Sequence, residues 1–277
     1  MTVSPAAENT GIVFRRIDLG EDAVVKAVAE NVSQTSRSTT LSSGNVDVHT
    51  VEHLLSALTG CGIDNALIDL DNAEVPILDG SAEPYVSVFK AAAQDAERVY
   101  FDVPQVIEIR DEKSGSWVRI EPAKTTSYEV TVDFGSKVLG VQNARWNGGE
   151  DYSSQIAPCR TFVFFHELEF LFANNLIKGG DVDNAIVIVE HPVTQEQLDR
   201  MTDLFGQRRL TVSGRGYLDN LTLHFPNECG RHKLLDLIGD LRLGGAFLHA
   251  RVSAFKPGHS INTKAAAAIR ALMAKKN

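Results

Sequence analysis

Apolar and polar residues alternate along several short segments, and this pattern predicts strands because successive side chains of a strand point to opposite faces. We expect the segments at residues 106–109, 117–120 and 128–132 to form consecutive antiparallel strands separated by polar turns. Further strands are expected at residues 11–16, 66–70, 185–190 and 250–255.

Other segments carry apolar residues every three or four positions, the spacing of an amphipathic helix. One helix is expected to begin with Thr50 as its N-cap and to end at Gly60 or two residues later. Another begins near His232 and ends near Gly244, and an Ala-rich helix capped by Asn262 is the last element. The remaining segments with helical tendency are residues 83–96 and 162–174.

A faint internal repeat relates the helix after Thr50 to the helix around His232. When His53 is aligned with His232, two leucines of each helix also align, and Gly60 falls opposite Gly239. The repeat predicts two related halves whose equivalent helices face each other.

Length and composition allow one large domain or two ordinary ones, since the chain has 277 residues, 43% of them hydrophobic and 23% charged. The expected boundary lies at residues 100–104, between an N-terminal domain of residues 1–103 and a C-terminal domain of residues 104–277. A formal net charge of −9 argues against a nucleic-acid-binding protein.

The chain also lacks the sequence signals of export. No apolar run is long enough to span a bilayer, and the N-terminus has no secretory pattern, so we expect a cytoplasmic protein without a transmembrane segment. The three cysteines are widely separated and odd in number, which fits a reducing compartment without a disulfide framework.

Two short motifs, far apart in the sequence, together offer three metal ligands and a general base. His232 and Asp236 are four residues apart, so on a helix they project from one face and can bind one ion. His53 is the third candidate ligand, and Glu52 beside it is the candidate base. Three protein ligands leave the fourth position of a tetrahedral zinc open for water, whose pKa the metal lowers to about 7. Zn²⁺ is the expected ion, and Fe²⁺ suits the same ligands.

A rival interpretation lies within the first motif. Residues 49–53 match the H-x-x-E-H pattern of inverzincin peptidases, in which both histidines bind zinc. That interpretation requires a helix that begins before His49, whereas Thr50 is expected to be the N-cap of this helix. The peptidase interpretation also gives the motif around His232 no role. A catalytically inactive binding protein is a third hypothesis.

Further polar residues are candidate ligands or candidate substrate contacts. Cys229 precedes His232 by three positions, but a fourth strong ligand would close the site, so we interpret Cys229 as a non-ligand. Lys256 and His259 flank Pro-Gly, which predicts a rigid loop that presents cations to an anionic substrate, or else a plain surface loop. The histidines without ligand spacing are expected to be structural: His166, His191, His224 and His249.

Seven segments, in order along the chain, resemble one known enzyme family. They are Val51-Glu52-His53-Leu54, Gly62-Ile63-Asp64-Asn65, residues 75–82, Arg160-Thr161-Phe162, residues 231–236, Ile238-Gly239-Asp240 and residues 256–259. The family is UDP-3-O-acyl-N-acetylglucosamine deacetylase, which catalyses the committed step of lipid A synthesis in Gram-negative bacteria. The match extends from about Thr10 to the final helix.

The resemblance implies an α+β fold of two similar domains, each a small sheet with two helices, with the helices sandwiched between the two sheets. It also implies that zinc is held by His53, His232 and Asp236, and that Glu52 activates the bound water. The substrate would be UDP-3-O-(3-hydroxyacyl)-N-acetylglucosamine, and hydrolysis of its N-acetyl group would give the free amine and acetate.

The resemblance gives five more residues a role. A protonated His259, oriented by Asp240, would steady the tetrahedral oxyanion and the departing amine, and Thr161 would hydrogen-bond the oxyanion. Lys233 would contact the phosphate and sugar end, and Phe162 would stack or pack against the substrate. Without the resemblance, Lys233 and Asp240 would be exposed helix charges, Thr161 a helix N-cap and Phe162 a core residue.

Three further expectations from the same resemblance concern an inserted unit, the start of the chain and its partners. Residues 162–189 should form an inserted unit whose apolar passage takes the acyl chain. The family begins with a strand and turn that contain Gly-Leu-His-Ser/Thr-Gly, and this chain starts after that point, so its first sheet should lack a strand. We expect a monomer, although fusion to a C-terminal dehydratase domain in some bacteria makes such a domain a candidate partner.

Overall fold

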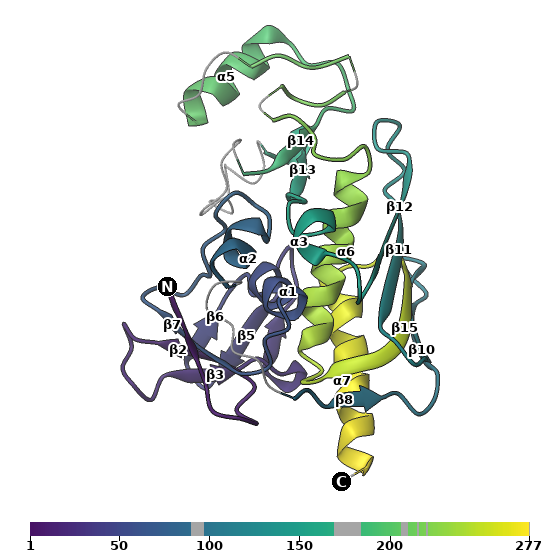
Figure 1. Cartoon of the computed structure of the whole chain (residues 1–277). Coiled ribbons are helices and arrows are strands. Elements are labelled where there is room, and N and C mark those ends of the chain that lie inside the picture. The colour runs from purple at the N-terminus through teal and green to yellow at the C-terminus, as the bar shows by residue number, and fades with distance from the viewer. Residues whose placement is uncertain (90–96, 169–183, 206–209, 215, 220, 277) are drawn as a thin grey trace.

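Two β-sheets with helices between them make up the body of the protein (Figure 1). The computed structural model describes residues 1–89, 97–168, 184–205, 210–214, 216–219 and 221–276. Strands and helices are both abundant in this part of the chain, and one large apolar core draws residues from both sheets and from the helices between them. The prediction of an α+β fold is therefore confirmed.

The first sheet has four strands in the order β1-β7-β2-β3. Its central pair, β2 and β7, is parallel, and both outer pairs are antiparallel. The strands are β1 (Thr2–Pro5), β2 (Ile12–Arg16), β3 (Val24–Lys26) and β7 (Ala66–Leu70). Beside it lies a small sheet, β4 (Val32–Gln34), β5 (Thr40–Ser43) and β6 (Val46–Val48), whose strands are too short to give a clear sequence pattern.

The second sheet has β15 between two hairpins, in the order β12-β11-β15-β10-β9, with β8 also paired to β15. Its strands are β8 (Tyr100–Asp102), β9 (Ile107–Asp111), β10 (Ser116–Pro122), β11 (Ser127–Asp133), β12 (Val141–Asn147) and β15 (Phe247–Phe255). The prediction that three consecutive strands pair with one another is right for β9 and β10 but wrong for β10 and β11. Local spacing cannot show that the nine-residue β15, antiparallel to β10 and parallel to β11, lies between them.

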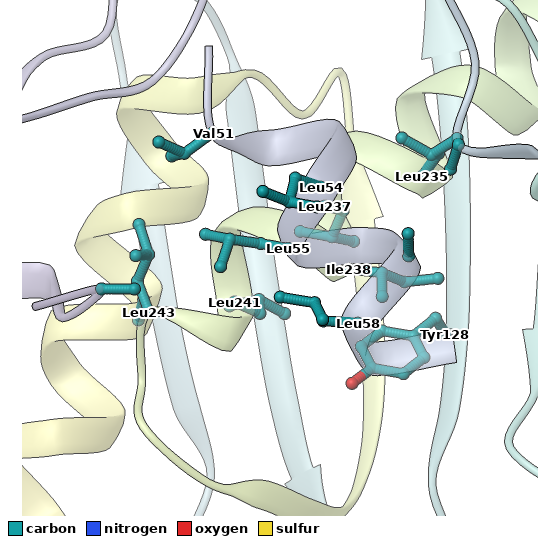
Figure 2. Packing of buried hydrophobic residues seen from close by; sticks show 14 of the residues in the cluster. Val51, Leu54, Leu55, Leu58, Tyr128, Leu235, Leu237, Ile238, Leu241 and Leu243 are labelled. Carbon is teal, nitrogen blue, oxygen red and sulfur yellow. The ribbon is translucent and has the colours of Figure 1, made fainter. Parts of the chain in front are cut away.

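The helices lie mainly between the two sheets (Figure 1). They are η1 (Ala29–Asn31), α1 (Glu52–Gly60), α2 (Glu83–Phe89), α3 (Tyr152–Gln155), α5 (Gln195–Phe205), α6 (Glu228–Arg242) and α7 (His259–Lys276). Figure 2 shows Leu54, Leu55 and Leu58 of α1 against Leu237 and Ile238 of α6, all fully buried. These two helices face each other, as the internal repeat predicts.

Two predicted helix caps are wrong. Helix α1 begins at Glu52, and Thr50 lies before it with a φ of 59°, where its hydroxyl donates to Glu74 Oε1 at 2.9 Å. Helix α7 begins at His259, so Asn262 lies within its first turn and directs its side chain inward. Both side chains bond a carboxylate that comes from elsewhere in the chain, and these long-range contacts outweigh the local capping preference.

Part of the predicted helix at residues 162–174 is instead a strand. Phe162–Phe164 forms β13, which pairs in parallel with β14 (Ile186–Ile188). Alternating phenylalanine and valine favour a strand, and tertiary pairing decides the outcome. Residues 90–96 of the predicted second helix, and residues 169–183 of the predicted acyl-chain unit, lie outside the described residues.

The division into domains of residues 1–103 and 104–277 stays a prediction. Strand β8 lies beside the expected boundary and pairs with β15 of the second sheet, not with the first. No helix in the described ranges is both long and apolar enough to cross a membrane.

Candidate metal centre

His53 of α1 and the pair His232 and Asp236 of α6 converge where the two helices meet. Asp236 Oδ1 lies 3.6 Å from His53 Nε2 and 3.4 Å from His232 Nε2. All three residues are buried, and the two imidazole rings meet edge to face with 4.9 Å between their centroids. The three donor atoms thus lie within 4.8 Å of one another and could hold one ion.

The surroundings of these side chains fit a metal ion. Asp236 Oδ1 is buried and has no hydrogen-bond partner among the described residues, whereas Oδ2 accepts from Lys233 Nζ at 2.8 Å. His232 Nδ1 faces the carbonyl oxygen of Cys159 at 3.1 Å. A carbonyl only accepts, so Nδ1 carries the proton and Nε2 presents its lone pair. Two imidazole nitrogens and one carboxylate oxygen form a donor set suited to zinc or iron(II).

Glu52 and His259 face each other next to this cluster. Glu52 Oε1 lies 3.9 Å from His259 Nε2, and Glu52 Oε2 accepts from the backbone N–H of Thr39 at 3.0 Å. On the other side of the imidazole ring, His259 Nδ1 bonds Asp240 Oδ2 at 2.9 Å. A candidate base and a candidate acid are therefore in one site.

Burial and neighbouring charges set the ionisation of these groups. Burial raises the pKa of Glu52 to about 7, so this carboxyl group gains and loses its proton near neutral pH. Burial opposes the charged form of His259, but the charges of Asp240 and Glu52 outweigh it and raise the pKa of His259 to about 10. Burial lowers the pKa of His232 to about 3, so this imidazole is neutral at physiological pH, as a metal ligand must be.

Lys233 and Phe162 lie together at one side of the cluster. The Lys233 ammonium lies 5.3 Å from the centroid of the Phe162 ring, and that ring lies 6.3 Å from the ring of His232. Asp236 raises the pKa of Lys233 although burial opposes its charge. Asp240 is fully buried, and the Lys233 side chain is 19% exposed, so neither is an exposed helix charge.

Thr161 lies just before β13, not at the start of a helix. Its backbone N–H donates to Gly80 O, and its carbonyl accepts from Ile186 N, both at 2.8 Å. Gly80 has a φ of +80°, and a Cβ there would lie 1.8 Å from Asn184 O, so only glycine allows this close approach. The neighbouring Phe162 contacts His232, so Thr161 belongs to the segment that borders the cluster.

The rival motif is not assembled. His49 precedes the positive-φ residue Thr50, so it lies outside helix α1, and its Nδ1 bonds Thr40 Oγ1 at 3.0 Å. The metal cluster found among the described residues does not include His49 or Cys229. Burial raises the pKa of the Cys229 thiol to about 12, which keeps it protonated.

Two residues of the site, Thr39 and Asn262, were not predicted as site residues from the sequence, where Asn262 was expected only as a helix cap. The Thr39 hydroxyl donates to Asp240 Oδ1 at 2.6 Å, and the Asn262 amide donates to Asp240 Oδ2 at 2.9 Å. Asn262 gave a usable signal, because it is a polar residue three positions after His259 and so shares its helix face. Thr39 lies outside every motif, and no local pattern marks it.

The sequence matches the profile of the UDP-3-O-acyl N-acetylglycosamine deacetylase family, LpxC, over residues 1–206 and 206–271. The chain belongs to this family. Among its relatives are bifunctional LpxC/FabZ enzymes from Porphyromonas gingivalis, 44% identical over 273 residues, and Bacteroides thetaiotaomicron, 42% identical over 273 residues. The UDP-3-O-acyl-N-acetylglucosamine deacetylase of Saccharophagus degradans is 37% identical over 273 residues, which cover 95% of this chain and 80% of that protein.

This LpxC chain spans only part of the bifunctional relatives. The two alignments cover 98% of the chain but 59% of each bifunctional enzyme. The residues that converge in the cluster, His53, His232 and Asp236, all fall within the two ranges that match the LpxC profile.

Proposed function

We propose that the chain is a metal-dependent amidase that removes the N-acetyl group of UDP-3-O-acyl-N-acetylglucosamine in lipid A biosynthesis. The observation that carries this proposal is the meeting of two sets of residues in one buried site. One set is the three-ligand cluster between α1 and α6, and the other is the facing pair Glu52 and His259. Membership of the LpxC family supplies the substrate class.

Zinc is the proposed ion, with iron(II) as the alternative for the same donors, and His53, His232 and Asp236 would hold it. When bound, such an ion activates water and polarises the amide carbonyl. Glu52 would accept the proton of the attacking water, since its pKa of about 7 leaves much of it ionised at neutral pH. His259, protonated up to about pH 10, would donate a proton to the departing amine.

The remaining roles concern binding and orientation. Asp240 would hold the His259 ring by the bond to Nδ1. Thr161 would donate its hydroxyl to the developing oxyanion, because it lies on the segment beside the cluster. Lys233 would contact the anionic, sugar end of the substrate, and the adjacent Phe162 ring would pack against it.

Partners and location remain proposals. We propose a monomer with a UDP-linked acylated glucosamine as its substrate. The bifunctional LpxC/FabZ relatives make a dehydratase domain a candidate partner. The cytoplasmic location and the acyl-chain passage at residues 162–189 also stay predictions.

Metal analysis with matched histidine variants tests the site. Purified wild type should contain one zinc or iron per chain, His232→Ala should lose it, and His49→Ala should keep it. If His232→Ala kept its metal and His49→Ala lost it, the proposed metal centre would be wrong and the peptidase hypothesis would be favoured.

Acetate release then tests the reaction. Wild type should release acetate from UDP-3-O-(3-hydroxyacyl)-N-acetylglucosamine, and Glu52→Gln should lose about 10²–10⁴-fold in kcat, the usual share of a general base. Substrate affinity without turnover in the metal-loaded wild type would favour the inactive, sugar-nucleotide-binding hypothesis instead.

A further inference from the structure

Thr39 connects the two sides of the site through two hydrogen bonds. Its backbone N–H donates to Glu52 Oε2 at 3.0 Å, and its hydroxyl donates to Asp240 Oδ1 at 2.6 Å. Thr39 is fully buried and precedes β5, in a part of the chain separate from α1, α6 and α7. Its carbonyl also accepts from Val51 N at 3.3 Å, which ties it to the start of α1.

Each bond restricts one carboxylate, that of Glu52 or that of Asp240. With Oε2 of Glu52 held by the Thr39 N–H, the other oxygen, Oε1, is the one that faces His259. With Oδ1 of Asp240 held by the Thr39 hydroxyl, Oδ2 is the oxygen that orients the His259 ring. Rotation of either carboxylate would break a bond to the same residue.

We propose that Thr39 is a positioning residue that holds Glu52 and the Asp240–His259 pair in register across the metal centre. This inference rests on the proposed function. The backbone N–H is common to every residue except proline, so the side-chain requirement is the hydroxyl, which threonine and serine alone supply with this reach. Valine has nearly the shape of threonine and leaves Asp240 Oδ1 without this donor.

Thr39→Val is therefore the primary variant. We expect kcat to fall about 10- to 100-fold, because small displacements of catalytic groups have effects of that size. KM should stay near the wild-type value, since the Thr39 side chain is fully buried and its hydroxyl is bonded to Asp240. Thr39→Ser, which restores the hydroxyl, should recover most of kcat.

The adjacent Thr40 provides a matched control. It is also buried, at 4% exposure, but its hydroxyl bonds His49, which is not one of the three clustered ligands. Thr40→Val should keep wild-type kcat. Equal losses of kcat in Thr39→Val and Thr40→Val, or no rescue by Thr39→Ser, would overturn the proposal in favour of a general packing effect.

A spectroscopic readout separates this inference from the proposed function. In histidine-¹⁵N-labelled protein, the signal of the His259 Nδ1 proton, identified by its loss in His259→Gln, reports the bond to Asp240. It should shift in Thr39→Val and return in Thr39→Ser, whether or not the protein deacetylates the substrate. An unchanged His259 signal in Thr39→Val would refute the positioning role. If Thr39→Val does not fold, the same measurement is made on Thr39→Ala.

Discussion

Glu52 and His259 differ in what they need from the same buried site. The carboxylate must lose its proton to act as a base, whereas the imidazole must keep its proton to act as an acid. The 3.9 Å between Glu52 Oε1 and His259 Nε2 lets each favour the charged form of the other. Asp240, on the far side of the ring, adds to the preference of His259 for a proton.

This arrangement predicts a bell-shaped pH dependence of kcat/KM. The rate should rise through about pH 7 as Glu52 ionises, and it should fall through about pH 10 as His259 loses its proton. Steady-state rates across that range measure both limbs. In His259→Gln the alkaline limb should vanish and the acid limb remain, and an unchanged alkaline limb would show that another group controls it.

The residues that converge could be predicted from the sequence, but the residues that orient the side chains beside them could not. His232 and Asp236 are four apart on one helix, His53 was a candidate ligand from its own motif, and the faint repeat predicted that the two helices face each other. The roles expected for Thr161 and Lys233 came from the resemblance and stay predictions. Thr39 reaches Asp240 across 201 positions of sequence, a contact that no local pattern encodes.

At the scale of elements, glycine lets α1 and α6 approach each other. A Cβ on Gly239 of α6 would lie 2.1 Å from the carbonyl oxygen of Glu52, so a side chain there cannot fit without moving α1. The repeat-related Gly60 of α1 instead faces Tyr152, whose ring atoms would lie 2.1 to 2.5 Å from a Cβ. The two aligned glycines thus serve different close contacts.

Gly239→Ala should separate the two ligand-bearing helices. We expect a loss of about 1–3 kcal/mol in the free energy of unfolding, the usual cost of overpacking, and weaker metal binding because His53 moves with Glu52. Urea denaturation and metal titration measure the two effects. Gly149→Ala, where a Cβ meets nothing within 4 Å, serves as the control. A stability and a metal affinity equal to those of this control would contradict the close packing.

The elements that were predicted well are those whose pattern is long and local. Helix α1 shows its leucine stripe plainly, β7 alternates buried and half-buried positions, and β2 is a short apolar run followed by two arginines. The predictions of the helix caps and of the strand order were wrong for the same reason. Thr50 and Asn262 bond carboxylates from elsewhere in the chain, and β15 pairs between β10 and β11, so long-range contacts outweigh the preference of the local sequence.

For the whole molecule, the candidate metal links segments that are far apart in sequence. His53 lies in α1, which packs near the first sheet, and His232 and Asp236 lie in α6, which packs against β11 and β12 of the second. An ion held by all three would bind the folded chain and not the unfolded one. Metal binding should therefore stabilise the entire fold.

Removal of the metal should lower the Tm of wild type. At a free metal concentration 100 times Kd, binding adds about 2.7 kcal/mol to the free energy of unfolding, and a chelator removes this contribution. Calorimetry of holo and chelated protein measures the difference. His232→Ala should show no response to the chelator, and a drop in its Tm equal to that of wild type would place the stabilising ion elsewhere.

The position of β15 has a consequence for synthesis on the ribosome. More than a hundred residues separate the end of β11 at Asp133 from the start of β15 at Phe247, so β10 and β11 leave the ribosome well before the strand that joins them. At the usual 5–20 residues per second the wait is roughly 6 to 23 s. During it the nascent chain has two unpaired sheet edges, the kind of surface that chaperones cover and that aggregates if left open.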